Sequence, residues 1–386
     1  MTPRTPTRRQ FLLAASAAVL AARASFAKAP QISARRILLG TGGKISKGIY
    51  TADWNPSTGE LGEITLAAEV AAPTFLAISS HGSRQFVYAV SEAGRTDSVL
   101  TAWATVPGQK ELRKLDEVAS VGGGPTHLSV SPDGRTVACA NYGGGSVSSY
   151  RVLPDGSLSK CVSHFQFTGS GPYKGRQDQP HTHSANITPD GQWVLVNDLG
   201  LDRIFIYHLN DATGEMTPSN PPFWSAKPGS GPRHLAFHPN GKWVYSVNEL
   251  TSTVDMLRWD AKRGTLTQFG SASTLKQGFP PNTAFAGEIL CSPDGRNVYV
   301  GNRVADDTIA VFDVNLHTGM LSLTQLAENG GKNPRHVAMD PSGRWIVICD
   351  QGSNSILILE RDLKSGHLSG TKHAYKLDTV EFAGFI

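Results

Sequence analysis

The sequence has few cysteines, and they lack the spacings that cysteine chemistry requires. Its four cysteines are Cys139, Cys161, Cys291 and Cys349, with no CxxC pair and no zinc spacing. Three of them lie in strand-like apolar runs, where cysteine is usually a small buried hydrophobic residue. We therefore expect no disulfide framework.

Long apolar stretches are also scarce. The one noticeable run extends from Ala14 to Ala22, after a twin-arginine pattern at Arg8-Arg9, and nothing later is long enough to span a membrane. Small residues around Ala27 suit cleavage there. We expect a signal peptide over 1–27, export to a periplasm by the twin-arginine route, and no membrane contact after cleavage. An uncleaved anchor is the alternative, which the short run, interrupted by Arg23, disfavours.

Charge of one sign is not in excess in the mature part. The chain has 36 Lys and Arg against 32 Asp and Glu, and the predicted signal holds four arginines and no acidic residue. Removing it leaves 32 of each sign. A neutral body without a basic tract argues against nucleic acid or an anionic membrane as a partner.

What the sequence does contain is a repeated turn, Pro-x-Gly, between two apolar runs. The turn glycines, including a degenerate first copy, are Gly82, Gly134, Gly191, Gly241, Gly295 and Gly343. A period of 48 to 57 residues built from short strands is typical of a β-propeller with four antiparallel strands in each blade. In the second copy we expect strands at about 126–131, 136–141, 146–152 and 158–166.

The two ends of the chain supply one more blade. Residues 36–70 contain three expected strands without an inner one, and residues 380–386 form a lone strand. Joining them closes the ring and removes both open edges. The sequence thus predicts an all-β, seven-bladed propeller over 28–386, closed by the C-terminal strand.

Propeller topology also predicts where polar residues meet. The inner strand of each blade begins, and the second strand ends, at the same face, whereas the Pro-x-Gly turns lie at the opposite face. The polar residues expected at the first face are His127, Tyr142, His181, His183, Asp198, Arg233, His234, Glu249, Glu288, Arg303, Arg335 and His336. The turn face carries Asp, Asn, Ser and Gly, which is ordinary turn chemistry. We expect a polar, anion-tolerant pocket at the first face.

Several of these residues have structural alternatives. Asp198 follows a strand and could cap a turn, and His234 could bond between blades as readily as contact a substrate. Three arginines at one mouth favour an anion or oxyanion site over pairing within the ring. The period-two spacing of His181 and His183 suits a metal, but two ligands make a weak site, and we expect none.

Paired motifs on successive blades resemble those of the lactonase β-propellers, which include 6-phosphogluconolactonases and carboxymuconate-lactonizing enzymes. They are Pro125-Thr126-His127 with Ala140-Asn141-Tyr142-Gly143, Pro180-His181-Thr182-His183 with Asp198-Leu199-Gly200, Gly231-Pro232-Arg233-His234 with Asn248-Glu249-Leu250, and Asn302-Arg303 with Asn333-Pro334-Arg335-His336. The resemblance covers nearly the whole mature chain. It implies catalytic roles for His183, Arg233 and Glu249, with Arg303 as a further anion contact.

Together these features predict a lactone hydrolase similar to 6-phosphogluconolactonase. Ring opening needs a base to activate water and donors for the oxyanion, so Glu249 or His183 is the base, and Arg233 and Arg303 hold the charge. The chain has no Gly-x-Ser-x-Gly, so an acyl-enzyme is not favoured, and no cofactor is implied. The remaining residues expected to contact substrate are His127, Tyr142, His181, Asp198, His234 and Arg335.

The expected partner is a small sugar lactone or a related organic acid. Export favours an unphosphorylated aldonolactone, because phosphorylated sugar lactones are cytoplasmic. Two alternatives stay open: a cyclase of the carboxymuconate type, and a non-catalytic binding propeller. Scaffold propellers tend to carry apolar anchors, whereas this mouth is charged and rich in histidine.

Overall fold

The computed structural model describes residues 36–386 except 44, 82–83, 93–97 and 281. The predicted signal peptide over 1–27 lies outside the described residues, as does part of the degenerate first turn. The described part consists of strands β1 to β29 and one short 3-10 helix, η1 (Gln351–Ser353). Among these residues no helix has the length and apolarity to cross a membrane. The four cysteines all lie in strands and are unpaired.

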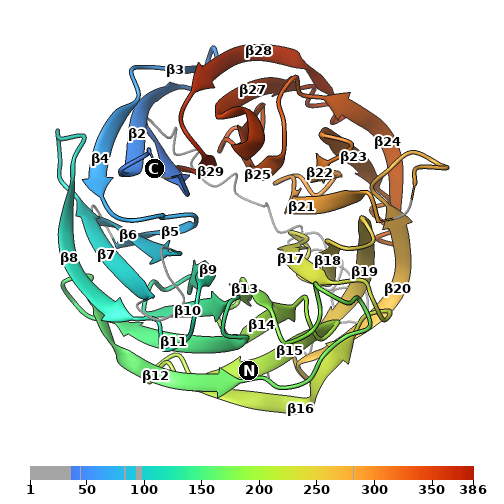
Figure 1. Ribbon diagram of the computed structural model, residues 1–386, viewed down its shortest axis with the longest axis horizontal. Helices are drawn as coiled ribbons and strands as arrows, with labels where there is room; N and C mark the ends of the chain where they lie inside the picture. The colour runs from blue at the N-terminus through green and yellow to red at the C-terminus, as the bar shows by residue number, and fades with distance from the viewer. Residues whose placement is uncertain (1–35, 44, 82–83, 93–97, 281) are drawn as a thin grey trace, which may run out of the picture. The chain divides into compact units, whose positions relative to one another are not determined.

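The strands form seven sheets arranged as a ring (Figure 1). From the centre outwards, the six blades that follow the first one are β5 (Leu76–His81), β6 (Arg84–Ser91), β7 (Val99–Thr105) and β8 (Leu112–Ala119); β9 (Pro125–Val130), β10 (Thr136–Asn141), β11 (Ser146–Val152) and β12 (Leu158–Gln166); β13 (Thr182–Ile187), β14 (Trp193–Asp198), β15 (Arg203–Leu209) and β16 (Met216–Ser225); β17 (Pro232–Phe237), β18 (Trp243–Asn248), β19 (Thr253–Asp260) and β20 (Thr265–Ser273); β21 (Ala284–Cys291), β22 (Asn297–Val304), β23 (Thr308–Val314) and β24 (Leu321–Glu328); β25 (Pro334–Met339), β26 (Trp345–Asp350), β27 (Ser355–Arg361) and β28 (Leu368–Lys376).

The first blade is completed by the end of the chain. The C-terminal strand β29 (Val380–Phe385) pairs antiparallel with β1 (Arg36–Thr41), with Leu38 opposite Gly384. Strands β2 (Gly48–Asn55), β3 (Glu60–Leu61) and β4 (Thr65–Glu69) follow outwards. The all-β, seven-bladed prediction and the closure of the ring by the C-terminal strand are therefore confirmed.

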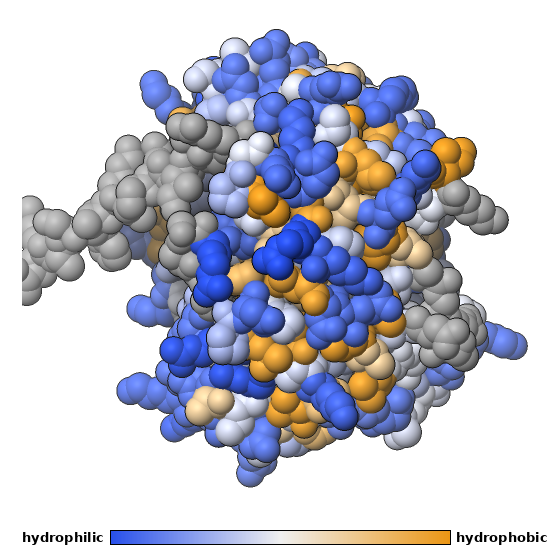
Figure 2. Space-filling model, turned by 90° about the vertical axis from the view of Figure 1, so that its left-hand side faces the viewer, coloured by the Kyte–Doolittle hydropathy of each residue, from blue (hydrophilic) through white to orange (hydrophobic). Residues whose placement is uncertain are grey.

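Neighbouring blades are held together by aromatic side chains at the start of second strands. Trp193 at the start of β14 donates from Nε1 to the carbonyl of Ala261 in the next blade, 2.9 Å away. Its ring also lies against Gly264, where an added Cβ would come within 2.2 Å of it. Trp345 makes the same kind of contact across the closure of the ring, donating to Pro56 O at 2.9 Å. Outside these contacts the side of the propeller is mixed: Figure 2 shows hydrophobic side chains interspersed among hydrophilic ones.

The inner strands share a β-bulge at the face where they begin. The pairing of β17 with β18 passes from Pro232 directly to His234, which leaves Arg233 as the extra residue. The same step leaves His183 extra in β13, Arg335 in β25 and Glu381 in β29. A bulge breaks the period of two and redirects a side chain, so consecutive residues such as Arg233 and His234 can both face the channel.

At the turn face, one Pro-x-Gly turn is tied to the next blade. Asp294 accepts hydrogen bonds from Ser292 Oγ at 2.6 Å and from the amide of Arg296 at 3.0 Å, as a turn aspartate usually does. It also accepts from Nη2 of the buried Arg361 in β27, at 3.0 Å. Asp190, in the corresponding turn of another blade, makes the two turn contacts, with Thr188 Oγ1 and the amide of Gln192.

This difference predicts unequal costs for two matched substitutions. Asp294→Ala should lower the free energy of unfolding by about 1–2 kcal/mol more than Asp190→Ala, because only the former takes a charged acceptor from a buried arginine. Urea unfolding followed by circular dichroism measures both. Equal losses in the two variants would mean that the contact with Arg361 contributes nothing to stability.

Candidate functional site

The carboxylate of Glu249, just after β18, lies at the centre of the face where the inner strands begin, here called the mouth. Its Oε2 is 3.0 Å from Arg233 Nε and 2.9 Å from Arg303 Nη2. Its Oε1 accepts a hydrogen bond from Arg176 Nη2. Glu249, Arg233 and Arg303 are all more than nine-tenths buried. Three guanidinium groups from separate segments therefore share one carboxylate.

This geometry fixes the charge states. Burial alone would raise the pKa of Glu249, but the guanidinium groups of Arg303, Arg233 and Arg176 outweigh it and lower the pKa to about 2. Burial lowers the pKa of Arg233 to about 9, an effect reinforced by Arg303 and opposed by Glu249. Glu249 is thus ionised at neutral pH and is a weak base there.

His183 lies beside this cluster and has the opposite electrostatic character. Its Nε2 is 4.0 Å from Glu249 Oε2, and its Nδ1 is 3.2 Å from Nε2 of His234. Burial lowers the pKa of His183 well below its ordinary value, and Arg233 lowers it further. His183 is therefore a neutral imidazole at pH 7, the state in which a ring nitrogen can accept a proton.

Arg176 is a site residue that the sequence reasoning did not identify. It lies in the irregular segment between β12 and β13, outside any repeat, and it reaches Glu249 from across the mouth. Its guanidinium stacks on Phe285 at 5.3 Å and hydrogen-bonds the Tyr142 side chain. The signal available in the sequence was the length of this segment, because long loops in compact folds are commonly functional.

Tyr142 and His181 form one wall of the mouth. Their rings stack with centroids 4.4 Å apart, and Nδ1 of His181 is 3.1 Å from the carbonyl oxygen of Tyr142. The edge of the Tyr142 ring faces His183, with centroids 5.3 Å apart. These two predicted substrate contacts thus lie next to the Glu249 cluster.

Arg335 and His127 lie farther from Glu249. Arg335 pairs with Glu381, with 2.5 Å between Nε and Oε2, and Glu381 also accepts from Gln351. His127 lies deeper in the channel, where its ring packs on Phe75 with centroids 4.2 Å apart and its Nδ1 accepts from the amide of Ala185.

Asp198 occupies a turn rather than the mouth. Its carboxylate is fully buried and accepts hydrogen bonds from the amides of His181 and Leu201 and from Thr182 Oγ1. With these three donors it holds the start of β13 against the end of β14. This placement supports turn capping, one of the two interpretations that the sequence left open, over substrate contact.

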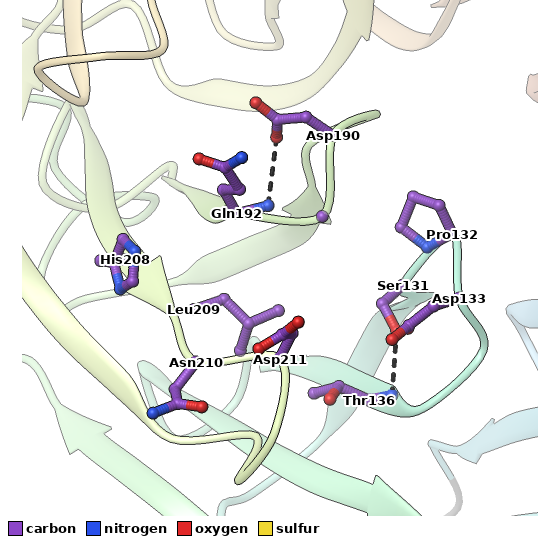
Figure 3. A pocket seen from close by; sticks show the side chains of 11 residues that line it. Ser131, Pro132, Asp133, Thr136, Asp190, Gln192, His208, Leu209, Asn210 and Asp211 are labelled. Atoms are coloured by element: carbon purple, nitrogen blue, oxygen red, sulfur yellow. Dashed lines mark hydrogen bonds between the residues drawn. The ribbon is translucent and has the colours of Figure 1, made fainter.

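The opposite face has a pocket of a different kind. It has a volume of about 520 Å³ and lies between two Pro-x-Gly turns, with Asp133, Asp190 and His208 in its wall (Figure 3). Asp190 accepts from the amide of Gln192, and Asp133 from Ser131 Oγ and the amide of Arg135. These carboxylates stabilise their own turns. In the described part of the chain, no group of three or more His, Cys, Asp or Glu side chains is arranged to hold a metal.

Comparison with known proteins places this site in a family. The family model described as lactonase, 7-bladed beta-propeller, matches residues 36–382. The chain belongs to this lactonase family. The prediction of a lactonase-family enzyme is therefore confirmed at the level of the family.

Three relatives illustrate the likeness of the lactonase chain. A 6-phosphogluconolactonase of Bacillus subtilis is 34% identical over 324 residues, which cover 84% of this chain and 90% of the relative. A solved structure from Bacteroides fragilis is 34% identical, with a TM-score of 0.84, and the match covers 92% of this chain and 99% of that one. The structure of a periplasmic gluconolactonase of Pseudomonas aeruginosa is 29% identical, also with a TM-score of 0.84, over 91% of this chain and 98% of that one.

The low pKa of Glu249 predicts a specific acid sensitivity. A carboxyl whose folded pKa of about 2 lies below its ordinary value of 4.5 contributes stability that is complete above pH 4.5 and is lost as the pH falls towards 2. The stability advantage of the parent over Glu249→Gln should therefore shrink by about 2 kcal/mol between pH 6 and pH 3. Urea unfolding of both proteins at each pH measures it. Parallel pH dependences in the two proteins would contradict the ion cluster.

Proposed function

We propose that this protein hydrolyses an unphosphorylated aldonolactone to the open-chain aldonate, with His183 as the general base. The observation that carries the choice of base is the contrast between the two candidates that the sequence left open. Glu249 is surrounded by three guanidinium groups that hold it ionised, whereas His183 is neutral beside it. A base with a pKa near 2 takes up a proton poorly at neutral pH.

In the proposed reaction His183 Nε2 removes a proton from a water molecule as the oxygen attacks the lactone carbonyl carbon. The carbonyl π bond opens and the resulting oxyanion is stabilised by Arg233 and Arg303. When the ring C–O bond breaks, the leaving alkoxide recovers the proton from His183. One water is consumed, one carboxylate and one hydroxyl are formed, and the base is regenerated.

The arginines have donor capacity left for such an oxyanion. Among the described residues, Arg233 Nη1 and Arg303 Nε are buried without a hydrogen-bond partner. Unpartnered buried donors are costly unless a ligand or water satisfies them. Glu249 acts in this proposal as a counter-ion that keeps the guanidinium groups together and aligned.

The charge balance supports the unphosphorylated substrate. Four guanidinium groups, of Arg176, Arg233, Arg303 and Arg335, face the two carboxylates of Glu249 and Glu381, which leaves two positive charges. One carboxylate is formed on ring opening, and a phosphate would add close to two further negative charges at neutral pH. The periplasmic gluconolactonase among the relatives and the predicted export signal support the same choice.

The assignment of the base predicts the effect of one substitution. His183→Gln should lower kcat for D-glucono-1,5-lactone by about a hundredfold or more, the usual contribution of a positioned general base. Acid release in a pH-stat, corrected for spontaneous hydrolysis, measures it. The control is His238→Gln, which removes another buried histidine at the opposite end of the channel. If Glu249→Gln lost activity while His183→Gln kept it, the roles of the two residues would be reversed.

The charge balance predicts the preferred substrate. kcat/KM for D-glucono-1,5-lactone should exceed that for its 6-phosphate by about tenfold or more, which corresponds to a difference of about 1.4 kcal/mol in transition-state stabilisation. The same pH-stat assay at constant ionic strength compares them. A preference for the phosphorylated lactone would overturn the substrate, and activity on neither would favour the binding propeller.

A further inference from the structure

A chain of three side chains runs from the mouth towards the centre of the channel. His183 Nδ1 is 3.2 Å from His234 Nε2, and His234 Nδ1 is 3.0 Å from both carboxylate oxygens of Glu288. The three residues come from β13, β17 and β21, the inner strands of three consecutive blades. His183 and Glu288 are positioned by the bulges in their strands. All three are more than nine-tenths buried.

The hydrogen-bond chemistry of this chain selects one arrangement of protons. Glu288 Oε1 accepts from its own neighbour, the amide of Ile289, at 3.1 Å, and its Oε2 lies 3.6 Å from His336 Nε2. Because His336 Nδ1 accepts from the amide of Ala383, the ring proton of His336 is on the nitrogen that faces Glu288. N–H groups therefore surround Glu288, and as an ionised carboxylate it can only accept.

The consequence passes along the chain. Since Glu288 accepts, the proton of neutral His234 is on Nδ1, and His234 Nε2 is an acceptor. His183 must then donate from Nδ1, which leaves the lone pair of its Nε2 directed at the mouth. The alternative, in which His183 Nε2–H donates to Glu249, is disfavoured because that contact is 4.0 Å, beyond hydrogen-bond range.

The surroundings of the chain favour moving positive charge inwards. His183 faces Arg233, Arg303 and Arg335, whose charges together with burial and His234 lower its pKa, and Glu249 and Tyr142 face it from the other side. A proton held on His183 is thus next to a positive cluster. His234 is the neighbour that contacts a carboxylate directly.

Around His234 and Glu288 the channel is lined by rings. Phe75 and His127 pack edge-on against His234, with centroids 5.9 and 5.0 Å away. Phe75 also contacts His336 and Phe382, at 5.7 and 4.9 Å. This packing of aromatic rings lowers the local dielectric, which strengthens the hydrogen bond between His234 and Glu288.

From this geometry we infer that Glu288 and His234 are positioning residues that fix the tautomer of His183 and carry away the proton it takes up. The inference rests on the proposed lactone hydrolysis for its catalytic meaning. When water gives a proton to His183 Nε2, the Nδ1 proton of His183 passes to His234 Nε2. His183 is then neutral again and His234 is a cation paired with Glu288. The two protons return along the same path when the leaving alkoxide is protonated.

The inference predicts both a rate and a pH effect for Glu288→Gln, which keeps the shape but removes the charge. kcat for D-glucono-1,5-lactone should fall at least about tenfold, as it does when a partner that orients an imidazole is lost. The acid limb of the kcat profile should move to lower pH, because loss of a negative charge makes the histidine pair harder to protonate. A merely structural role would lower the melting temperature and leave the position of the acid limb unchanged.

A double-mutant cycle provides the second readout. His234→Gln should lower kcat to a similar extent as Glu288→Gln, and the double variant should be no slower than either single one, because the chain works as a unit. The matched control is His238→Gln, which removes a buried histidine just beyond the other end of β17. Additive losses, or an equal loss in His238→Gln, would overturn the relay.

The proton arrangement itself can be measured without a substrate. In ¹⁵N-histidine-labelled protein, two-bond correlations at pH 7 should show His183 protonated on Nδ1 and bare on Nε2, with His183→Gln providing the assignment. In Glu288→Gln the His183 signals should shift towards a mixture of tautomers. Protonation of His183 on Nε2 in the parent would overturn the inference. The expected tautomer in a protein inactive on every lactone would leave the chain standing and reject the proposed hydrolysis instead.

Discussion

Three guanidinium groups can be buried within reach of one another in this propeller because the carboxylate of Glu249 lies between them. Like charges in a poorly solvated site repel strongly, and each loses its hydration on burial. Glu249 opposes both effects, with one oxygen shared by Arg233 and Arg303 and the other bound to Arg176. The same contacts hold its pKa at about 2, so the residue that makes the cluster possible is poorly suited to take up protons within it.

The fold delivers these groups through a local irregularity repeated around the ring. In a regular strand, alternate side chains point away from the channel, and only every second residue could reach the mouth. The bulges in β13, β17, β25 and β29 make His183, Arg233, Arg335 and Glu381 extra residues in their strands. Arg233 can therefore bind Glu249 while the next residue, His234, contacts His183. Bulges are common next to active sites because they redirect side chains in this way.

Periodicity in the sequence is sufficient to predict the blades and the face on which the polar residues meet, because turns and apolar runs repeat with the architecture. It predicted β10, β11 and β12 with the observed bounds and the closure of the ring by residues 380–386. It does not show the bulges, because these change the pairing of the backbone without changing the pattern of residues. Arg176 was missed for a related reason: it lies in a segment without a repeat, and its role comes from a contact between residues 73 positions apart. The alternatives for Asp198 could be separated only by seeing which donors surround its carboxylate.

The mouth and the channel beneath it have different electrostatic tasks in the hydrolysis proposed here. Ring opening develops negative charge on the substrate, which the excess of guanidinium groups stabilises, but it also places a proton on the base next to those groups. A histidine alone in this position would be a poor base, since the charges that stabilise the oxyanion disfavour its cation. A second histidine paired with Glu288 resolves this conflict by separating the two charges in space. The oxyanion stays with the arginines at the mouth, and the proton is shared one blade further round and deeper in the channel, where the nearest charge is a carboxylate.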